Sequence, residues 1–422
     1  MQIDLQRSFL AESLTVFDRK NLCKKICKYN KKKRKEKMKK FFAILLCLCM
    51  VFALVACNTP DVDDDDDKDN GKETEAPATE APATEAPETD APEVEAPVEA
   101  EYKLGMGIVV STASSKAGNA QVDATVATVV LDKDGKIVVC RIDVAQNKMN
   151  VTDGAVEADK TFETKMELGT RYNMAAYGSD NNGDGIVLEW DAQTKAFEQY
   201  VVGMTAAEVA AIQTQFVNNH YIAVDEALLT AGCTMQITDF MEAVSKACND
   251  EQGMTFKTAG EFTLGVAAKS TAAESVAATA EADGTVKMYS DFAASVIADG
   301  KILASLNDAI QPNIAIDAAG ECTPAEFKGT KRELKEGYNM AAFGQSMDWN
   351  GDGKVLEWYV QSAEFSKFVV GKTATEVADM ATQVVEGAGY VISADADLLA
   401  AGCTIQITAI KAVVAQSATN AR

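Results

Sequence analysis

Apolar and polar residues alternate in the same way in two parts of the chain. Alternating β-branched residues lie on both sides of a turn at Asp134 and Gly135, and the pattern recurs around Asp299 and Gly300. This alternation about a central Asp-Gly turn is typical of two antiparallel strands joined by a tight hairpin. We therefore expect an antiparallel hairpin in each part of the chain.

Helix-start signals follow each hairpin at matching positions. Thr205 and Glu208 form a capping box before the segment AAIQTQFV, and Thr373 and Glu376 repeat it before ADMATQVV, so a helix is expected to begin at each site. The surrounding pattern predicts further elements in the same order in both parts. These are helices over 190–202 and 358–370, short strands at the MQIT and IQIT segments, and last helices over 239–247 and 409–415.

The repeated pattern coincides with repeated sequence. The segment DNNGDGIVLEW that starts at Asp180 recurs as DWNGDGKVLEW at Asp348, 168 positions later. The AGCT segment that ends at Thr234 recurs at Thr404, 170 positions later. Because the spacing barely drifts, the chain carries two tandem copies of one domain.

We place repeat 1 at 102–250 and repeat 2 at 262–418. Each copy has about 150 residues rich in apolar side chains and is long enough to bury a core of its own. Hairpins, then helices, then a short strand and a last helix are the order expected of an α+β domain. The predicted fold is thus two antiparallel sheets with helices packed on them.

A secretory signal precedes the repeats. The segment 38–57, MKKFFAILLCLCMVFALVAC, has a basic start, an apolar run too short to span a bilayer comfortably, and small residues at its end. Its last residues, Leu54 to Cys57, resemble the lipobox of bacterial lipoproteins. That resemblance implies that Cys57 is acylated and anchors the chain at the outer face of the cytoplasmic membrane. An uncleaved membrane anchor is the alternative, and it also places the repeats outside.

Residues 1–37 fit neither a signal peptide nor a domain. Their apolar residues are scattered, and they carry a basic run from Lys31 to Lys35. We interpret this extension as a start codon assigned too early. A basic cytoplasmic arm that binds nucleic acid is the alternative interpretation.

The composition of residues 58–101 predicts a disordered tether. They contain an aspartate run and close variants of TEAPA with regularly placed prolines, a composition that cannot build a core. In an extended polyproline form at about 3 Å per residue, the tether would reach on the order of 130 Å. It is long enough to lift the repeats into or through a cell wall.

The net charge of the chain restricts the classes of molecule that it can bind. The formal net charge is −23, and residues 1–56 carry 14 Lys or Arg against 4 Asp or Glu, so the chain without them is close to −33. Such a field disfavours nucleic acid and anionic lipid surfaces and is compatible with cations or with solubility alone. We expect no nucleic-acid partner.

The cysteines beyond Cys57 do not form a repeated framework. They are odd in number, and only two of them match between the copies, whereas a disulfide framework would repeat with the domain. We therefore expect free thiols, mostly buried, at Cys140, Cys233, Cys248, Cys322 and Cys403.

The aspartate segments place oxygen donors at alternate positions before a glycine. This spacing lets side chains converge on one ion while the glycine allows a sharp turn, as in an EF-hand loop. The pattern DxNGDGxxLE also resembles the Excalibur class of extracellular calcium loops, with Leu in place of Cys. An Asx-rich turn that caps the next helix is the alternative. The predicted Ca²⁺ ligands are Asp180, Asn182, Asp184 and Glu189 in repeat 1, and Asp348, Asn350, Asp352 and Glu357 in repeat 2.

The hairpin with DGKI, the TAxEV helix and a small-residue turn ending in Thr resemble the FMN-binding domain of bacterial exported flavoproteins, some of which are lipoproteins of Gram-positive bacteria. The resemblance covers each copy nearly end to end. It implies an extracellular electron carrier with a redox partner, and FMN joined by phosphoester to a turn threonine. The matching cofactor-binding residues are Gly232 and Thr234 in repeat 1 and Gly402 and Thr404 in repeat 2.

The turns depart from that family's pattern at two places. Alanine replaces its first small hydroxyl residue, and Leu228 and Leu398 replace its aspartate. Covalent flavin, noncovalent flavin and a flavin-like fold without flavin all remain open. In the last case the protein would be a calcium-stabilised surface binding or adhesion protein, with the two copies supplying avidity for a surface ligand.

No catalytic set is common to both copies. His220 is the only histidine, and counting along the sequence gives Gly389 as its counterpart, so neither a histidine triad nor a histidine zinc site can be shared. The pairs Trp190 and Trp358, and Tyr172 and Tyr338, favour aromatic core packing over ligand stacking. We therefore predict no catalytic residues; with flavin bound, the protein would be an electron carrier.

Overall fold

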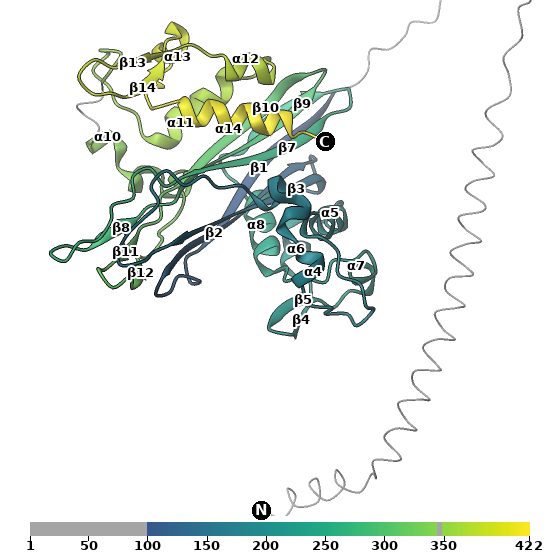
Figure 1. Cartoon of the computed structure of the whole chain (residues 1–422). Helices are drawn as coiled ribbons and strands as arrows, with labels where there is room; N and C mark the ends of the chain where they lie inside the picture. Colours follow the sequence, from purple (N-terminus) through teal and green to yellow (C-terminus); the bar gives the residue numbers. More distant parts are fainter. Residues whose placement is uncertain (1–98, 344–347) are drawn as a thin grey trace, which may run out of the picture. The chain divides into compact units, whose positions relative to one another are not determined.

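The structure, a computed structural model, describes residues 99–343 and 348–422 (Figure 1). The predicted extension 1–37, the signal segment 38–57 with Cys57, and almost all of the tether 58–101 lie outside the described residues. The first strand begins at Ala100, so the predicted end of the tether overlaps it slightly.

Repeat 1 contains three long strands followed by helices and a short hairpin. Its elements are β1 (Ala100–Ser111), β2 (Asn119–Leu131), β3 (Ile137–Asn150), α3 (Lys165–Leu168), η1 (Gly169–Tyr172), α4 (Met174–Tyr177), α5 (Trp190–Tyr200), α6 (Ala206–Ala210), β4 (Thr214–Val217), β5 (His220–Ala223), α7 (Glu226–Thr230) and α8 (Thr238–Cys248). The strand β6 (Met254–Thr258) follows and pairs back onto β1.

Repeat 2 has the same order with a small additional sheet. Its elements are β7 (Thr263–Thr271), β8 (Gly284–Val286), β9 (Tyr289–Ala298), β10 (Lys301–Ile310), β11 (Ile314–Ile316), β12 (Cys322–Pro324), α9 (Lys331–Leu334), η2 (Lys335–Tyr338), α10 (Met340–Phe343), α11 (Trp358–Phe368), α12 (Ala374–Ala378), β13 (Thr382–Val384), β14 (Val391–Ser393), α13 (Ala396–Ala400) and α14 (Thr408–Thr419). The fold class is α+β.

The main sheets are antiparallel, with strand orders β3-β2-β1-β6 and β10-β9-β7. The predicted hairpins are confirmed: β2 pairs with β3 and β9 pairs with β10. The small sheet β12-β11-β8 and the hairpins β4-β5 and β13-β14 complete the described sheets. Both predicted capping boxes are present, with each threonine hydroxyl accepting from the backbone N–H of its glutamate.

Two predictions about local structure are wrong. The MQIT and IQIT segments are not strands; α8 and α14 begin at their final threonines. In repeat 1, Met235 and Ile237 are buried, and Ile237 donates one backbone hydrogen bond to Tyr221 instead of joining a ladder. The helix expected at AAIQTQFV ends at Ala210, because the next residues pair as β4 with β5.

Each sheet has helices on its outer face, and the inner faces of the two sheets pack on each other. In Figure 1 the sheets lie between the helices of repeat 2, in yellow-green, and those of repeat 1, in teal. One apolar cluster joins residues of both sheets, including Leu104 and Val126 with Phe292 and Leu306. Separate clusters lie between each sheet and its own helices. Each copy thus buries one core alone and shares another.

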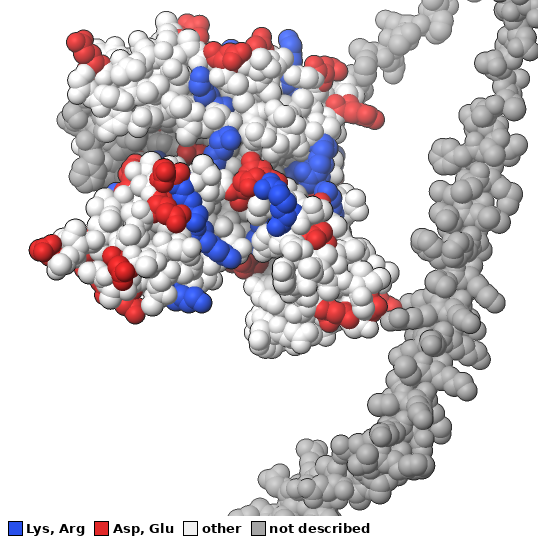
Figure 2. Space-filling view, in the orientation of Figure 1, with Lys and Arg blue, Asp and Glu red and all other residues white. Residues whose placement is uncertain are grey.

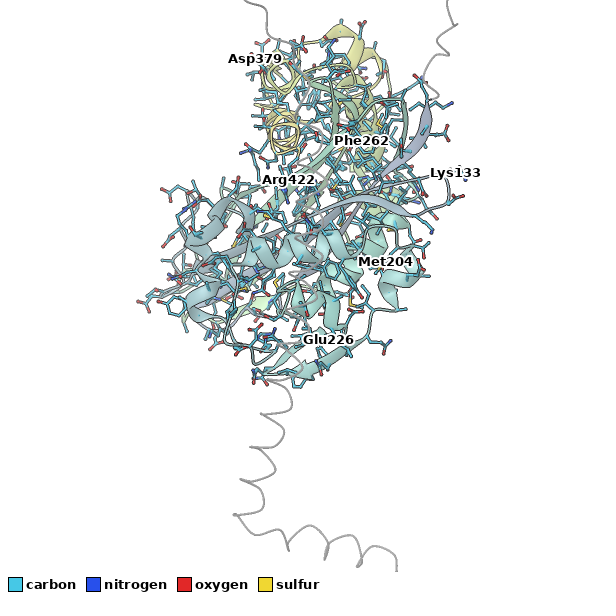
Figure 3. All side chains as sticks on the ribbon, turned by 90° about the vertical axis from the view of Figure 1, so that its right-hand side faces the viewer. Lys133, Met204, Glu226, Phe262, Asp379 and Arg422 are labelled. Carbon is cyan, nitrogen blue, oxygen red and sulfur yellow. The ribbon has the colours of Figure 1, made fainter. Side chains whose placement is uncertain are left out.

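Charged side chains also connect the two copies. Arg332 of repeat 2 pairs with Asp250 of repeat 1 at 3.1 Å, and both side chains are buried. Arg422 pairs with Glu198 at 3.1 Å, and it lies between the helices of the two repeats (Figure 3). Figure 2 shows basic side chains gathered across the middle of one face, next to acidic ones.

The cysteines of the described region are free, as predicted, and Cys322 is the only one among them that is not buried. No helix in the described region has the length and apolar character needed to cross a membrane.

Candidate functional site

The first aspartate of each aspartate loop, Asp180 or Asp348, accepts hydrogen bonds from backbone N–H groups within its own loop. In repeat 1, Asp180 accepts hydrogen bonds from the backbone N–H groups of Gly183, Asp184 and Gly185, at 2.8 to 3.2 Å. Asp348 accepts in the same way from Asp352 and Gly353. These bonds bend the chain into the turn that the sequence spacing predicts.

The loop glutamates contact a different segment. The Glu189 carboxylate accepts from the backbone N–H of Met174 at 2.9 Å, and Glu357 accepts from Met340 at 2.8 Å. Each glutamate thereby satisfies a donor at the start of the short helix α4 or α10. Within residues 99–343 and 348–422, no group of three or more Asp, Glu, His or Cys side chains is placed to hold a metal ion together.

One predicted calcium ligand keeps an oxygen without a partner. The amide nitrogen of Asn350 donates to Asp352 at 3.1 Å and to the carbonyl of Leu399 at 3.0 Å. Its Oδ1 is buried and accepts no hydrogen bond in the described structure. A buried oxygen in this state is costly, and a cation or water at this point would satisfy it.

The AGCT turn packs directly on the aspartate loop. Gly232 has φ +93°, and a Cβ there would lie 2.3 Å from a methyl group of Leu188. Gly402 has φ +87° and stands in the same relation to Leu356. Glycine is therefore needed both for the backbone conformation and for the close approach of the leucine. The two predicted motifs of each copy form one structural unit.

A buried glutamine that sequence reasoning missed connects the two motifs. The Gln193 side chain donates to the carbonyl of Leu188 at 2.8 Å and accepts from the backbone N–H of Thr234 at 2.9 Å. Gln361 makes the same pair of bonds in repeat 2, at 2.7 Å each, to Leu356 and Thr404. The signal was present, because both copies read WxxQ after the loop.

The predicted attachment threonines are buried. Thr234 is 2% exposed and Thr404 is 5% exposed, and each hydroxyl lies 3.3 to 3.5 Å from the oxygen of its glutamine. A modifying enzyme could not reach either hydroxyl in this conformation. Thr234 nevertheless lines a cavity, so a small molecule inside that cavity could contact it.

That cavity has a volume of about 540 Å³ and lies in repeat 1. The volume falls within the range of about 300–1,000 Å³ that is usual for small-molecule sites. Its wall carries many hydroxyl, amide and carboxylate groups, among them Ser111, Thr125, Gln146, Asn181, Gln193 and Asp239. Such a wall can hydrogen-bond a ligand along most of its length.

A lysine enters this wall between two aromatic rings. The ammonium of Lys165 lies 4.9 Å from the ring centre of Tyr172 and 5.5 Å from that of Trp190, within cation–π range. Trp190 is 2% exposed and belongs to the core of repeat 1, as expected. Lys165 is the cationic group of the cavity wall, and sequence reasoning did not single it out.

Repeat 2 keeps the same trio. Lys331 lies 5.0 Å from the ring centre of Tyr338 and 5.1 Å from that of Trp358. A second, smaller cavity of about 190 Å³ is lined by Lys331 and Tyr338 but not by Thr404. The recurrence in both copies identifies the trio as part of the domain's framework.

Two buried aspartates tie the strands to the trio. Asp143 on β3 accepts from the backbone N–H of Met166, and Asp308 on β10 accepts from that of Arg332. Burial raises the pKa of each carboxyl to about 6, while the hydrogen bonds act in the opposite direction. These carboxyls hold α3 and α9 in place and do not line the cavity of repeat 1.

The strand register changes the counterpart assigned to His220. His220 pairs with Val217 across β4-β5, and at the matching place in repeat 2 the carbonyl of Tyr390 accepts a hydrogen bond from the backbone N–H of Val385. The turn between β13 and β14 is longer than that between β4 and β5, so the counterpart is Tyr390, not Gly389. His220 lines the cavity of repeat 1.

Comparisons of the chain with family models, with curated proteins and with solved structures gave no match.

Proposed function

We propose that repeat 1 is an extracytoplasmic binding domain for FMN and that the protein carries electrons at the cell surface. The observation that carries the proposal is the cavity of about 540 Å³ that has Thr234 in its wall. When bound, FMN supplies reversible electron transfer. The protein's part is to hold and orient it.

The residues of the cavity fit the chemistry of a flavin. Side-chain amides such as those of Gln146 and Asn181 can both donate and accept hydrogen bonds, as the pyrimidine edge of a flavin ring requires. Hydroxyls and amides also suit the hydroxylated side chain of FMN. The ammonium of Lys165 is the group that would pair with the phosphate.

Burial of Thr234 favours noncovalent binding over a phosphoester. The hydroxyl is engaged with Gln193 and is 2% exposed, so its modification requires the AGCT turn to open. Noncovalent binding requires only that a ligand enter the cavity.

The test is titration of the purified full-length protein with FMN and with riboflavin, followed by flavin absorption and fluorescence. Lys165→Met should weaken FMN binding about tenfold, equivalent to about 1.4 kcal/mol, and leave riboflavin binding unchanged. The matched variant Lys331→Met, in repeat 2, should bind both ligands like the parent protein. Absence of flavin binding would refute the proposal. A fluorescent band on a denaturing gel that Thr234→Ala removes would favour the covalent form.

A calcium-stabilised binding protein without flavin is the second candidate. The observation that favours it is the buried, unpaired Oδ1 of Asn350 in the predicted loop of repeat 2. A site with Kd one hundredfold below the Ca²⁺ concentration would raise the free energy of unfolding by about 2.7 kcal/mol. Melting temperatures with Ca²⁺ and with a chelator test this, and Asp348→Asn should remove the part of any difference that the repeat 2 loop contributes. Equal melting in both conditions would count against calcium.

The cellular location is part of the same proposal. We place the repeats at the outer face of the cytoplasmic membrane of a Gram-positive bacterium, held by a lipid on Cys57, with a redox partner or surface ligand outside. Replacement of Cys57 by alanine should prevent lipid labelling of the protein. Unchanged labelling would contradict the lipobox interpretation.

A further inference from the structure

The two copies differ where the cavity of repeat 1 lies. Asn181 and His220 both line that cavity, and they come from the aspartate loop and from the hairpin β4-β5. Asn181 donates to the carbonyl of Thr234 at 2.8 Å, so it stands directly beside the predicted cofactor-binding turn.

Aromatic residues hold both positions in repeat 2. Trp349 follows Asp348 as Asn181 follows Asp180, and Tyr390 has the register of His220. The two rings lie 5.9 Å apart with an interplanar angle of 35°. Both residues are half-buried. Two aromatic rings therefore bridge the aspartate loop and the hairpin of repeat 2, whereas in repeat 1 the bridge is a hydrogen bond of 3.0 Å from the amide of Asn218 to Asn181.

A third difference lies on the sheet, at one register position shared by the two copies. Asp143 pairs with Val126 in repeat 1, and its counterpart Asp308 pairs with Phe292 in repeat 2, so Val126 and Phe292 are equivalent positions. The residues that precede them, Thr125 and Asp291, are therefore equivalent as well. Thr125 lines the cavity of repeat 1. Burial raises the pKa of Asp291 to about 6, and the charge of Lys331 opposes that rise. Repeat 2 thus has a carboxyl group at the register position where repeat 1 has the hydroxyl of Thr125.

We infer that the copies have divided roles: repeat 1 binds one ligand molecule per chain, and repeat 2 fills the equivalent place with Trp349, Tyr390 and Asp291. This inference rests on the proposed function of repeat 1. It adds that ligand binding is asymmetric and that these three positions decide which copy binds. Repeat 2 then serves as a framework that covers the inner face of the sheet of repeat 1.

The test measures the stoichiometry of FMN binding to the full-length protein by calorimetry. The parent protein should bind one FMN per chain, and Asn181→Trp with His220→Tyr should abolish that binding. The reciprocal variant, Trp349→Asn with Tyr390→His and Asp291→Thr, should bind two. Trp349→Phe with Tyr390→Phe is the control that keeps both rings, and it should still bind one.

The outcomes separate this inference from the proposed function. Two FMN molecules on the parent protein, or one that survives the repeat 1 substitutions, would overturn the asymmetry while leaving flavin binding intact. No binding to the parent protein would refute the flavin proposal, and the division of roles with it. Circular dichroism and the unfolding midpoint of each variant show whether lost binding comes from lost folding. If the double variant of repeat 1 does not fold, the single variant Asn181→Trp is tested in its place. FMN binding retained by this single variant would overturn the inference.

Discussion

The glutamine that joins the aspartate loop to the AGCT turn should be a main determinant of stability. Gln193 is 1% exposed and makes hydrogen bonds of 2.8 and 2.9 Å to Leu188 and Thr234. Gln193→Met keeps the length of the side chain but leaves a buried carbonyl and a buried N–H unpaired. At about 1–3 kcal/mol for each of the two unpaired groups, the free energy of unfolding should fall by about 2–6 kcal/mol.

Urea unfolding followed by circular dichroism measures this loss, and the slope of the transition should not change. Gln361→Met should cost a similar amount, because Gln361 makes the same two bonds in repeat 2. Gln199→Met on the same helix α5 is the control, since Gln199 is exposed, and it should stay within about 0.5 kcal/mol of the parent. The reasoning is refuted if Gln193→Met and Gln199→Met unfold alike.

Three further substitutions test other features. Burial raises the pKa of the Asp143 carboxyl to about 6, so the stability it contributes at low pH is lost as pH rises through 6. The free energy of unfolding, measured in urea at several pH values, should fall between pH 4 and pH 7 by up to about 3 kcal/mol less in Asp143→Asn than in the parent protein. The same pH dependence in both proteins would contradict the burial effect. Arg332→Met removes the counter-charge of the buried Asp250 carboxylate, which keeps hydrogen bonds only from backbone N–H groups, and should cost about 3–5 kcal/mol in chemical unfolding; Asp250→Asn in the same chain should recover part of it. Gly232→Ala should lower stability by at least about 1–3 kcal/mol, more than Gly183→Ala, whose added methyl meets no neighbour; equal melting temperatures would contradict the close-packing argument.

Local signals in the sequence sufficed for much of the fold. Period-two alternation around Gly135 and Gly300 gave both hairpins, and the capping boxes at Thr205 and Thr373 gave the helix starts. The MQIT segment has the alternation of a strand, but this alternation arises because Met235 and Ile237 are buried in the core. It therefore predicted a strand where the structure has none. Contact between the two sheets was not predictable, since both faces of each sheet are apolar.

The candidate site was predictable only in part. Repetition marked the loop from Asp180 and the turn at Thr234, and the structure joins them through Gln193, which the pattern WxxQ could have revealed. Lys165 escaped notice because only the fold brings it between Tyr172 and Trp190. The difference between Asn181 in repeat 1 and Trp349 in repeat 2 could not be interpreted from the sequence, because only the structure shows that Asn181 lines a cavity.

The apolar contact between the sheets constrains how the chain originated. A polypeptide with a single copy would expose the inner face of its sheet, where Leu104 and Val126 now meet Phe292. An exposed apolar face of this kind promotes self-association, and two identical chains could cover one another with twofold symmetry. Gene duplication would then have fused a homodimer into one chain. Fusion would also release the two halves from identity, so that each could change independently of the other.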